Sequence, residues 1–187
     1  MGKRDRETKS DRTRGAILAA ARDLFAAKGY ERTTVRDIAG RASIDPSMVI
    51  RYFVGKDELF ARVATIDLKL PNLESIDPSR LGETLVRHFL HLWEEDGRSG
   101  LPVLLRSAAS NEFAATKLRE VFARQVIPAL ERGRARTDAA EHAGFVASQL
   151  IGLAMCRYVL KLPAVVGMSR DLIINEVGQT IQRYVSD

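Results

Sequence analysis

The chain has 187 residues, of which 45% are hydrophobic and 28% charged, a balance typical of a globular protein. Its single cysteine excludes an internal disulfide, and no apolar run reaches the roughly 18 residues that a membrane-spanning helix needs. The charged start lacks the apolar stretch of a secretory signal. The sequence therefore predicts a cytoplasmic protein that does not contact a membrane.

The positive charge is concentrated at one end of the chain. Residues 1–62 contain 14 Lys and Arg against 9 Asp and Glu, whereas residues 63–187 contain 15 of each. Lys and Arg release counterions from phosphates, so this bias favours a segment that approaches nucleic acid. Basic N-terminal regions are also common in proteins in which these charges are only solvated. The order of the residues is needed to distinguish nucleic-acid binding from simple solvation.

Apolar residues recur at intervals of three and four, which predicts an all-α fold of about nine helices. The first helix is expected over residues 12–28, ending at Gly29, a residue that enters the left-handed backbone region cheaply. A short helix then follows Thr34, whose side chain can cap it, and ends near Arg41.

Asp45-Pro46 is a second start signal, because a carboxylate caps the helix and Pro fits its first turn. It opens a third helix over 46–53, joined to the second by a tight turn at 42–44, and a fourth opens at Lys56. Short helices joined by such a turn form a helix-turn-helix unit.

The order of residues 20–60, AARDLFAAKGYERTTVRDIAGRASIDPSMVIRYFVGKDELF, resembles the DNA-binding domain of the tetracycline-repressor (TetR) family of transcriptional regulators. The resemblance implies a basic arm over 1–14, a helix-turn-helix domain over 15–62, and a ligand-binding and dimerisation domain over 63–187. Two positions depart from the family pattern. Ile50 stands where the family typically has a phosphate-contacting Tyr, and Ser43 stands where a Gly is usual in the turn.

The second helix of such a unit enters the major groove, while the first crosses the DNA backbone. The DNA-binding residues predicted on this basis are Thr34, Arg36, Pro46, Ser47, Met48, Arg51, Tyr52 and Lys56. The candidates for base contacts are Pro46, Ser47, Met48 and Arg51. The candidates for phosphate contacts are Thr34, Arg36, Tyr52 and Lys56. Alternatively, Met48 and Tyr52 belong to the core, and Arg51 and Lys56 are only solvated.

Six basic residues stand at the start of the chain: Lys3, Arg4, Arg6, Lys9, Arg12 and Arg14. Such an arm can lie in the minor groove. Because acidic residues interleave with them, a solvated tail is the alternative that the composition favours.

The remaining helices are expected over residues 77–95, 101–109, 112–133, 138–161 and 169–185. Pro128 should bend or divide the third of these, since it lacks a backbone donor. The last two helices have more apolar surface than one face needs, which indicates packing on two sides. The predicted homodimer interface comprises Ala143, Ala147, Leu150, Ile174, Val177 and Ile181. The alternative is a helix fully buried in a monomer.

The family resemblance implies a small-molecule effector, unidentified from the sequence, held between the helices of 77–133. The candidate ligand-binding residues are His88, Phe89, Trp93, Arg106, Phe113 and Arg157. Each large apolar residue could equally be plain core. His88, His91 and Glu94 share a helix face at a spacing that a metal could use, but surface or capping roles are favoured.

The function predicted from these features is a ligand-responsive transcriptional regulator, repression being the family's usual mode. It would bind a palindromic double-stranded DNA operator as a homodimer. No phosphate-binding loop, nucleophile elbow or cofactor motif is present in the sequence, and Cys156 lies in an apolar helix, so no catalytic residue, cofactor or metal is predicted. The alternative is a helical binding protein or enzyme without a role at DNA.

Overall fold

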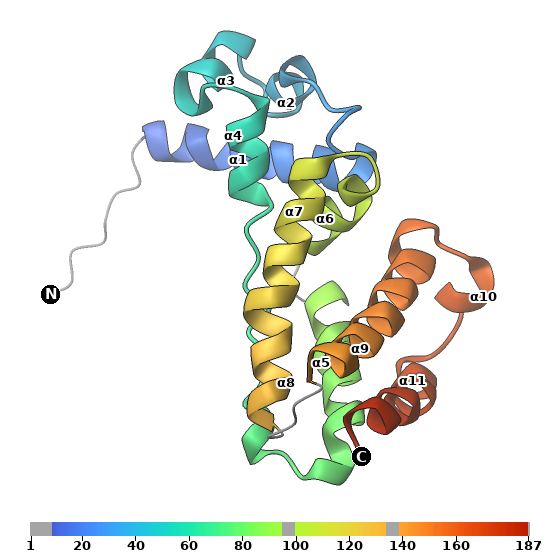
Figure 1. Ribbon diagram of the computed structural model, residues 1–187. Coiled ribbons are helices and arrows are strands. Elements are labelled where there is room, and N and C mark those ends of the chain that lie inside the picture. Colours follow the sequence, from blue (N-terminus) through green and yellow to red (C-terminus); the bar gives the residue numbers. More distant parts are fainter. Residues whose placement is uncertain (1–8, 95–99, 134–138, 187) are drawn as a thin grey trace, which may run out of the picture. The chain divides into compact units, whose positions relative to one another are not determined.

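The computed structural model describes residues 9–94, 100–133 and 139–186. These residues form helices and connecting segments, with no strand among them, which confirms the all-α prediction (Figure 1). The fold divides into two compact units. The first contains residues 1–65 and 103–117, and the second contains residues 66–102 and 118–187.

The first unit is built on the four N-terminal helices: α1 (Lys9–Lys28), α2 (Val35–Arg41), α3 (Pro46–Phe53) and α4 (Lys56–Val63). The bounds of α2 and α3 and the start of α4 agree with those predicted. Helix α1 begins at Lys9, so Lys9, Arg12 and Arg14 belong to a helix rather than to an arm. The other three basic residues predicted for that arm lie outside the described residues.

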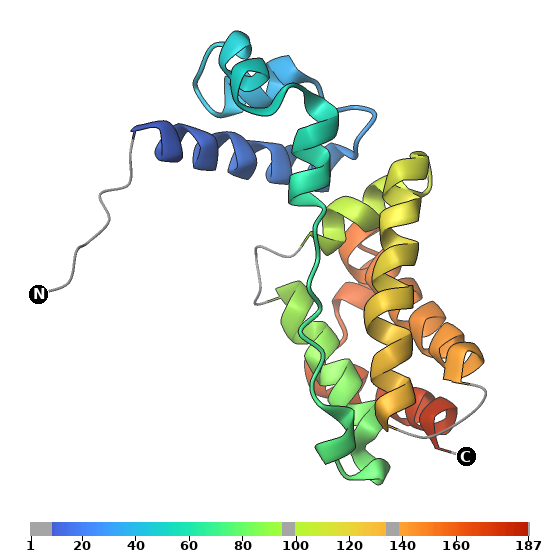
Figure 2. The ribbon, with the colours of Figure 1, turned by 60° about the vertical axis from the view of Figure 1, so that its left-hand side comes forward.

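The ribbons of these helices lie against one another in Figures 1 and 2, and one aliphatic and aromatic core joins them. Its fully buried members are Ile17, Ala21, Phe25, Ile38, Ala39, Val49, Phe53, Leu59 and Phe60. Phe25 and Phe60 meet edge to face with their ring centroids 5.1 Å apart, an arrangement that aromatic quadrupoles favour. The helix-turn-helix pair α2–α3 is thereby held on α1 and α4.

The predicted caps are present. The hydroxyl of Thr34 accepts from the backbone N–H of Asp37 at 3.1 Å, and the Asp37 carboxylate accepts from the backbone N–H of Thr34 at 3.1 Å. This capping box satisfies N–H groups that an α-helix leaves free at its start. Asp45 caps α3 in front of Pro46. Both helix starts are therefore set by local sequence.

Three turns of the first unit use positive backbone φ angles. Gly29 has a φ of 78°, as predicted for the end of α1, and Ser43 has a φ of 55° in the turn between α2 and α3. Val54 has a φ of 59° where α3 ends. This conformation is rare for a β-branched residue and costs roughly 1 kcal/mol or more.

Residues 103–117 also pack in the first unit, although they follow the predicted domain boundary by forty residues. They comprise most of α6 (Leu101–Ala108) and the first turns of α7 (Glu112–Val121). The buried hydroxyl of Ser107 accepts from the backbone N–H of Tyr30 at 3.0 Å. The Phe113 ring lies 6.0 Å from that of Phe60. These contacts join residues about 50 to 80 positions apart, which no local pattern predicts.

The second unit contains α5 (Leu81–Glu94), α8 (Ile127–Gly133), α9 (Ala139–Ala154), the short α10 (Pro163–Val166) and α11 (Arg170–Val185). The 3₁₀ turns Leu73–Ser75 and Pro78–Arg80 precede α5, and Ser169, where the last helix was expected to begin, caps α11. The four-residue α10 was not among the predicted helices. The expected start of the 138–161 helix at residue 138 lies outside the described residues.

Two helices of the second unit contain a wide π turn. Residues Phe122–Val126 form one between α7 and α8, directly before Pro128, and Met155–Val159 form the other after α9. Pro128 has no backbone N–H and its ring clashes with the preceding turn of a regular helix. The wider turn relieves this, so the predicted perturbation of the 112–133 helix is present as a π turn.

Helices α5 and α11 cross at two glycines. A Cβ added to Gly82 would overlap the carbonyl oxygen of Gly178 and lie 2.6 Å from the backbone nitrogen of Gln182. The Gln182 side chain also accepts from the backbone N–H of Gly82 and donates to the carbonyl of Pro78, both at 2.8 Å. The two backbones therefore approach as closely as they can, which holds the ends of this unit together.

Candidate nucleic-acid interface

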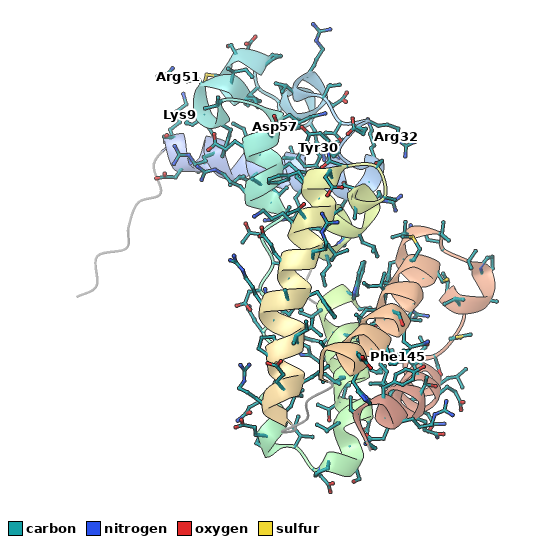
Figure 3. The ribbon with its side chains drawn as sticks, viewed as in Figure 1. Lys9, Tyr30, Arg32, Arg51, Asp57 and Phe145 are labelled. Atoms are coloured by element: carbon teal, nitrogen blue, oxygen red, sulfur yellow. The ribbon has the colours of Figure 1, made fainter. Side chains whose placement is uncertain are left out.

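One face of α3 is open to solvent and the other anchors the helix. Val49 and Phe53 are fully buried, whereas Pro46, Ser47 and Arg51 are exposed and Met48 is half-buried. Four of the predicted DNA-binding residues thus lie on or beside the free face, and none of them is in the core. Figure 3 shows Arg51 projecting from the outer side of α3.

The hydroxyl of Ser47 is already used within the protein. It donates to Asp45 at 2.5 Å, and the same carboxylate oxygen accepts from the Ser47 backbone N–H at 2.8 Å. These two bonds, the side-chain one foremost, lower the pKa of Asp45, because they stabilise the carboxylate. With its proton engaged, Ser47 presents acceptor lone pairs outward, which suits a base amino group.

The predicted phosphate contacts of α2 lie at its exposed start. Thr34 and Arg36 are exposed there, and no ion pair of Arg36 or of Arg51 occurs among the described residues, whereas the exposed Arg41 is paired with Asp23 at 2.6 Å. An unpaired guanidinium on a free surface can bind a phosphate without first breaking a salt bridge. Arg36 and Arg51 are therefore the free cations of the helix-turn-helix pair.

The first turns of α1 lie beside α3. The guanidinium carbon of Arg14 lies 5.8 Å from the centre of the Tyr52 ring, within the range of a cation–π contact. Lys9 and Arg12 are exposed on the same turns, and Figure 3 shows Lys9 at the beginning of α1. The half-buried Tyr52 thus links a basic helix start to the predicted reading helix.

Lys56 and Asp57, at the start of α4, enclose Tyr30. The Lys56 ammonium donates to the Tyr30 carbonyl at 3.2 Å and lies 4.0 Å from the centre of its ring. The Tyr30 hydroxyl donates to the Asp57 carboxylate (Figure 3). An ammonium has three donors, so this contact leaves others for a phosphate. Lys56 was predicted either to contact DNA or to be only solvated, and its role in joining α1 to α4 was missed.

The candidate ligand-binding residues do not all lie in one unit. Phe89, Trp93 and His88 are on α5, and Arg157 follows α9 in the second unit, but Arg106 and Phe113 belong to the first. Phe113 packs on Phe60, and the half-buried Arg106 is beside Gly29. The last two residues therefore support the helix-turn-helix domain within their own unit.

An aromatic cluster lies at the end of α5. The rings of Trp93 and Tyr158 are stacked with centroids 4.8 Å apart, and Phe89 is 6.0 Å from Trp93 and 6.4 Å from Tyr158. Tyr158 also donates to Glu94 at 2.9 Å. Burial foremost, and then the Glu94 carboxylate, raise the pKa of Tyr158, which keeps it a neutral donor.

Glu94 is the centre of an ion-pair network. It pairs with Arg157 at 3.4 Å and with Arg170 at 3.0 Å. Arg157 further donates to the carbonyls of Val165, at 2.7 Å, and Met168, at 3.1 Å. His88 contacts the carbonyl of Leu68 at 2.7 Å. No group of acidic, His or Cys residues suited to a metal occurs among the described residues.

The predicted dimer residues are divided between core and surface. Ala143, Ile174 and Ile181 are buried within their own chain, and Ala147, Leu150 and Val177 are partly exposed. The large apolar side chains left on the surface of α9 and α11 and around α10 are Phe145, Ile151, Leu160, Leu162, Val166, Met168 and Leu172. Phe145 points away from α9 in Figure 3. The spacing of apolar residues along a single helix does not predict which of them neighbouring helices bury.

Within the described ranges, none of the helices is both long enough and apolar enough to cross a bilayer. The arrangement of the first unit suits binding to a polyanion: two capped helices, free guanidinium groups and a basic helix start share one compact body.

Comparisons with known proteins agree with this geometry. Residues 17–63 match the family described as bacterial regulatory proteins, tetR family, and residues 79–185 match the tetracyclin repressor-like C-terminal domain. A solved TetR-family regulator from Streptomyces coelicolor A3 is 31% identical over all of both chains, with a TM-score of 0.62.

Two further relatives are informative. The transcriptional repressor Rv3405c of Mycobacterium tuberculosis is 41% identical over 61 residues, which span 33% of this chain and 32% of that protein. The match to curated relatives therefore covers about a third of their length. SmeT, the repressor of a Stenotrophomonas maltophilia efflux pump, solved with triclosan, is 22% identical over 92% of this chain and 89% of its own, with a TM-score of 0.65.

Proposed function

The chain belongs to the TetR family of transcriptional regulators, and from that premise we propose that it binds a two-fold symmetric DNA operator as a homodimer and leaves it when a small molecule binds. Members of this family are DNA-binding regulators rather than enzymes. As the relatives Rv3405c and SmeT are repressors, we propose repression as its mode, in the cytoplasm where the DNA is.

The free face of α3 is the observation that carries the proposal. Ser47 and Arg51 are exposed on it, while Val49 and Phe53 hold the helix from behind. Arg51 can bind guanine through two hydrogen bonds, and Arg36 at the start of α2 can bind a phosphate. A short helix must be rigidly attached to recognise a base sequence, because the side chains of a loosely held helix do not keep a fixed position relative to the base pairs.

The test of DNA binding is selection of duplexes from a random pool, followed by anisotropy titration of the recovered duplex. Arg51→Ala should reduce discrimination at one position of each half-site by about 1–3 kcal/mol. Arg36→Ala should weaken all duplexes alike and lower the salt slope by about 0.9 per contact. Arg87→Ala, an exposed cation of the second unit, is the matched control and should change neither property.

A homodimer is proposed because an operator with two half-sites needs two reading helices at a fixed separation, about 34 Å or a multiple of it. The exposed apolar side chains of α9, α10 and α11, such as Ile151 and Leu172, supply a surface for a second copy. Gly144 and Gly152 are also exposed on α9, and small residues permit close helix approach. Sedimentation measures the proposed state directly.

The effector is proposed to act in the second unit, at the aromatic cluster of Phe89, Trp93 and Tyr158. An aromatic or amphipathic molecule suits such side chains, and triclosan in SmeT is a molecule of that kind. The chain passes between the two units at 65–66, 102–103 and 117–118, the last within α7. A ligand that displaces α7 therefore acts on a helix continuous with the first unit.

A thermal-shift screen of aromatic compounds identifies the effector, since a ligand that binds the folded state raises its melting temperature. Linkage requires that DNA weaken the binding of a true effector by the factor with which the effector weakens DNA binding, typically 5- to 150-fold. A compound that binds free and DNA-bound protein equally is not an effector. Trp93, the single tryptophan, reports binding by its fluorescence.

A further inference from the structure

Two exposed aliphatic side chains on the free face of α3 are not explained by the contacts described so far. Ile50 is 48% exposed and Val54, at the end of the helix, is 79% exposed. They lie four residues apart, so they share one face of the helix with Ser47 and Arg51. Each leaves apolar area in water beside the polar Ser47 and the charged Arg51.

Neither side chain can serve a phosphate. Ile50 has no hydrogen-bond donor, so it gains nothing beside a charged oxygen. The edges of the four base pairs in the major groove carry a single apolar group, the C5-methyl of thymine. A helix face that combines Arg51 with an aliphatic side chain is therefore complementary to a groove in which a guanine stands near a thymine.

Ile50 is better placed for that methyl than Val54. It is the fifth residue of α3, one turn after Pro46 and directly before Arg51, and so lies a full turn closer than Val54 to the helix end that contacts base edges. Val54 is the C-cap residue that follows the helix, with its backbone at a φ of 59°, and a recognition helix contacts bases through residues toward its N-terminal end.

We propose that Ile50 is a specificity-determining residue that contacts the C5-methyl group of a thymine, within one or two base pairs of the base that Arg51 binds. The inference rests on the proposed binding of DNA by α3. Each half-site of the operator would then contain a thymine that the protein recognises by burying its methyl group, without a hydrogen bond to that base.

The test removes the methyl group from the DNA and the side chain from the protein. A duplex is selected from a random pool with the full-length protein, and each of its thymines is replaced in turn by deoxyuridine, which differs only by the C5-methyl. We expect one symmetry-related position at which the change weakens binding of the unaltered protein about fourfold per half-site, as burial of one methyl predicts.

Ile50→Ala should bind the thymine and uracil duplexes equally at that position, because the partner of the methyl is gone. Val54→Ala is the matched control, since it also shortens an exposed aliphatic side chain of the same face, and it should keep the full uracil effect. Circular dichroism melting of Ile50→Ala should match that of the unaltered protein, because the side chain is exposed.

The outcomes separate the two proposals. A selected duplex with no uracil-sensitive position, or an uracil effect that persists in Ile50→Ala, overturns the role of Ile50 and leaves DNA binding intact. If the uracil effect is lost in Val54→Ala and kept in Ile50→Ala, the thymine methyl contacts Val54, and the proposed role of Ile50 is also overturned. A pool that yields no enriched duplex overturns the proposed function, and this inference with it.

Discussion

The ammonium of Lys56 donates to the carbonyl of Tyr30 at 3.2 Å and lies 4.0 Å from the centre of its ring. This contact joins the end of α1 to the start of α4. Lys56→Ala should therefore lower stability by about 1–2 kcal/mol, or several degrees in melting temperature, in the absence of DNA. Arg51→Ala should leave the free energy of unfolding within about 0.5 kcal/mol of the original. Equal melting of the two variants would contradict a structural role for Lys56.

The crossing of α5 and α11 tolerates no side chain at Gly82. Gly82→Ala places a methyl group against the backbone of Gly178 and Gln182, so the helices must separate. We expect a loss of about 1–3 kcal/mol or more in the free energy of unfolding, measured by urea denaturation. Gly15→Ala, in α1 with no atom within 4 Å of the added group, should instead stabilise by up to about 1 kcal/mol.

The exposed apolar surface of α9 and α11 can be tested without disturbing the core. Ile151→Glu and Leu172→Glu change exposed residues, so each variant should fold normally and be monomeric by light scattering, with weaker binding to DNA. Charged variants of the buried Ile174 are unsuitable, because they would unfold the chain. Dimers of unchanged mass for both exposed variants would place the interface elsewhere.

Gly144→Ala tests the same surface more gently. Apart from its chain neighbours and the backbone of its own helix, no atom of the described residues lies within 4 Å of the added methyl, so helix propensity should stabilise the isolated chain by up to about 1 kcal/mol. If a second copy approaches α9 closely, the same methyl should weaken the dimer. Sedimentation equilibrium together with thermal melting distinguishes the two effects, and a dimer constant that does not fall would argue against close packing there.

The aspartate that caps α3 should make stability depend on pH. Hydrogen bonds from Ser47 lower the pKa of Asp45 in the folded state from its ordinary value of 3.8, so the carboxylate stabilises the fold above that pH. The contribution is lost as pH falls from 3.8 through the lowered folded value. Asp45→Asn keeps a capping side chain that does not titrate. Its melting temperature should lie below the original at pH 7, and the gap should close below pH 3.8.

Local sequence determined most of the first unit and the location of its reading helix. Thr34, Asp45, Pro46 and Gly29 act on backbone groups within a few residues, so their effect can be predicted from adjacent residues alone. The structure places the caps and the turn as predicted, and the exposed positions of Ser47 and Arg51 follow from the spacing of Val49 and Phe53.

Tertiary structure decided the features that depend on distant residues. Ser107 reaches the backbone of Tyr30 across 77 positions, which adds residues 103–117 to the first unit, and the burial of Ala143 and Ile181 depends on neighbouring helices. Helical periodicity shows that a helix has an apolar face, but it does not show which neighbour covers that face. Burial is a property of the assembled helices, and only their packing separates core from free surface.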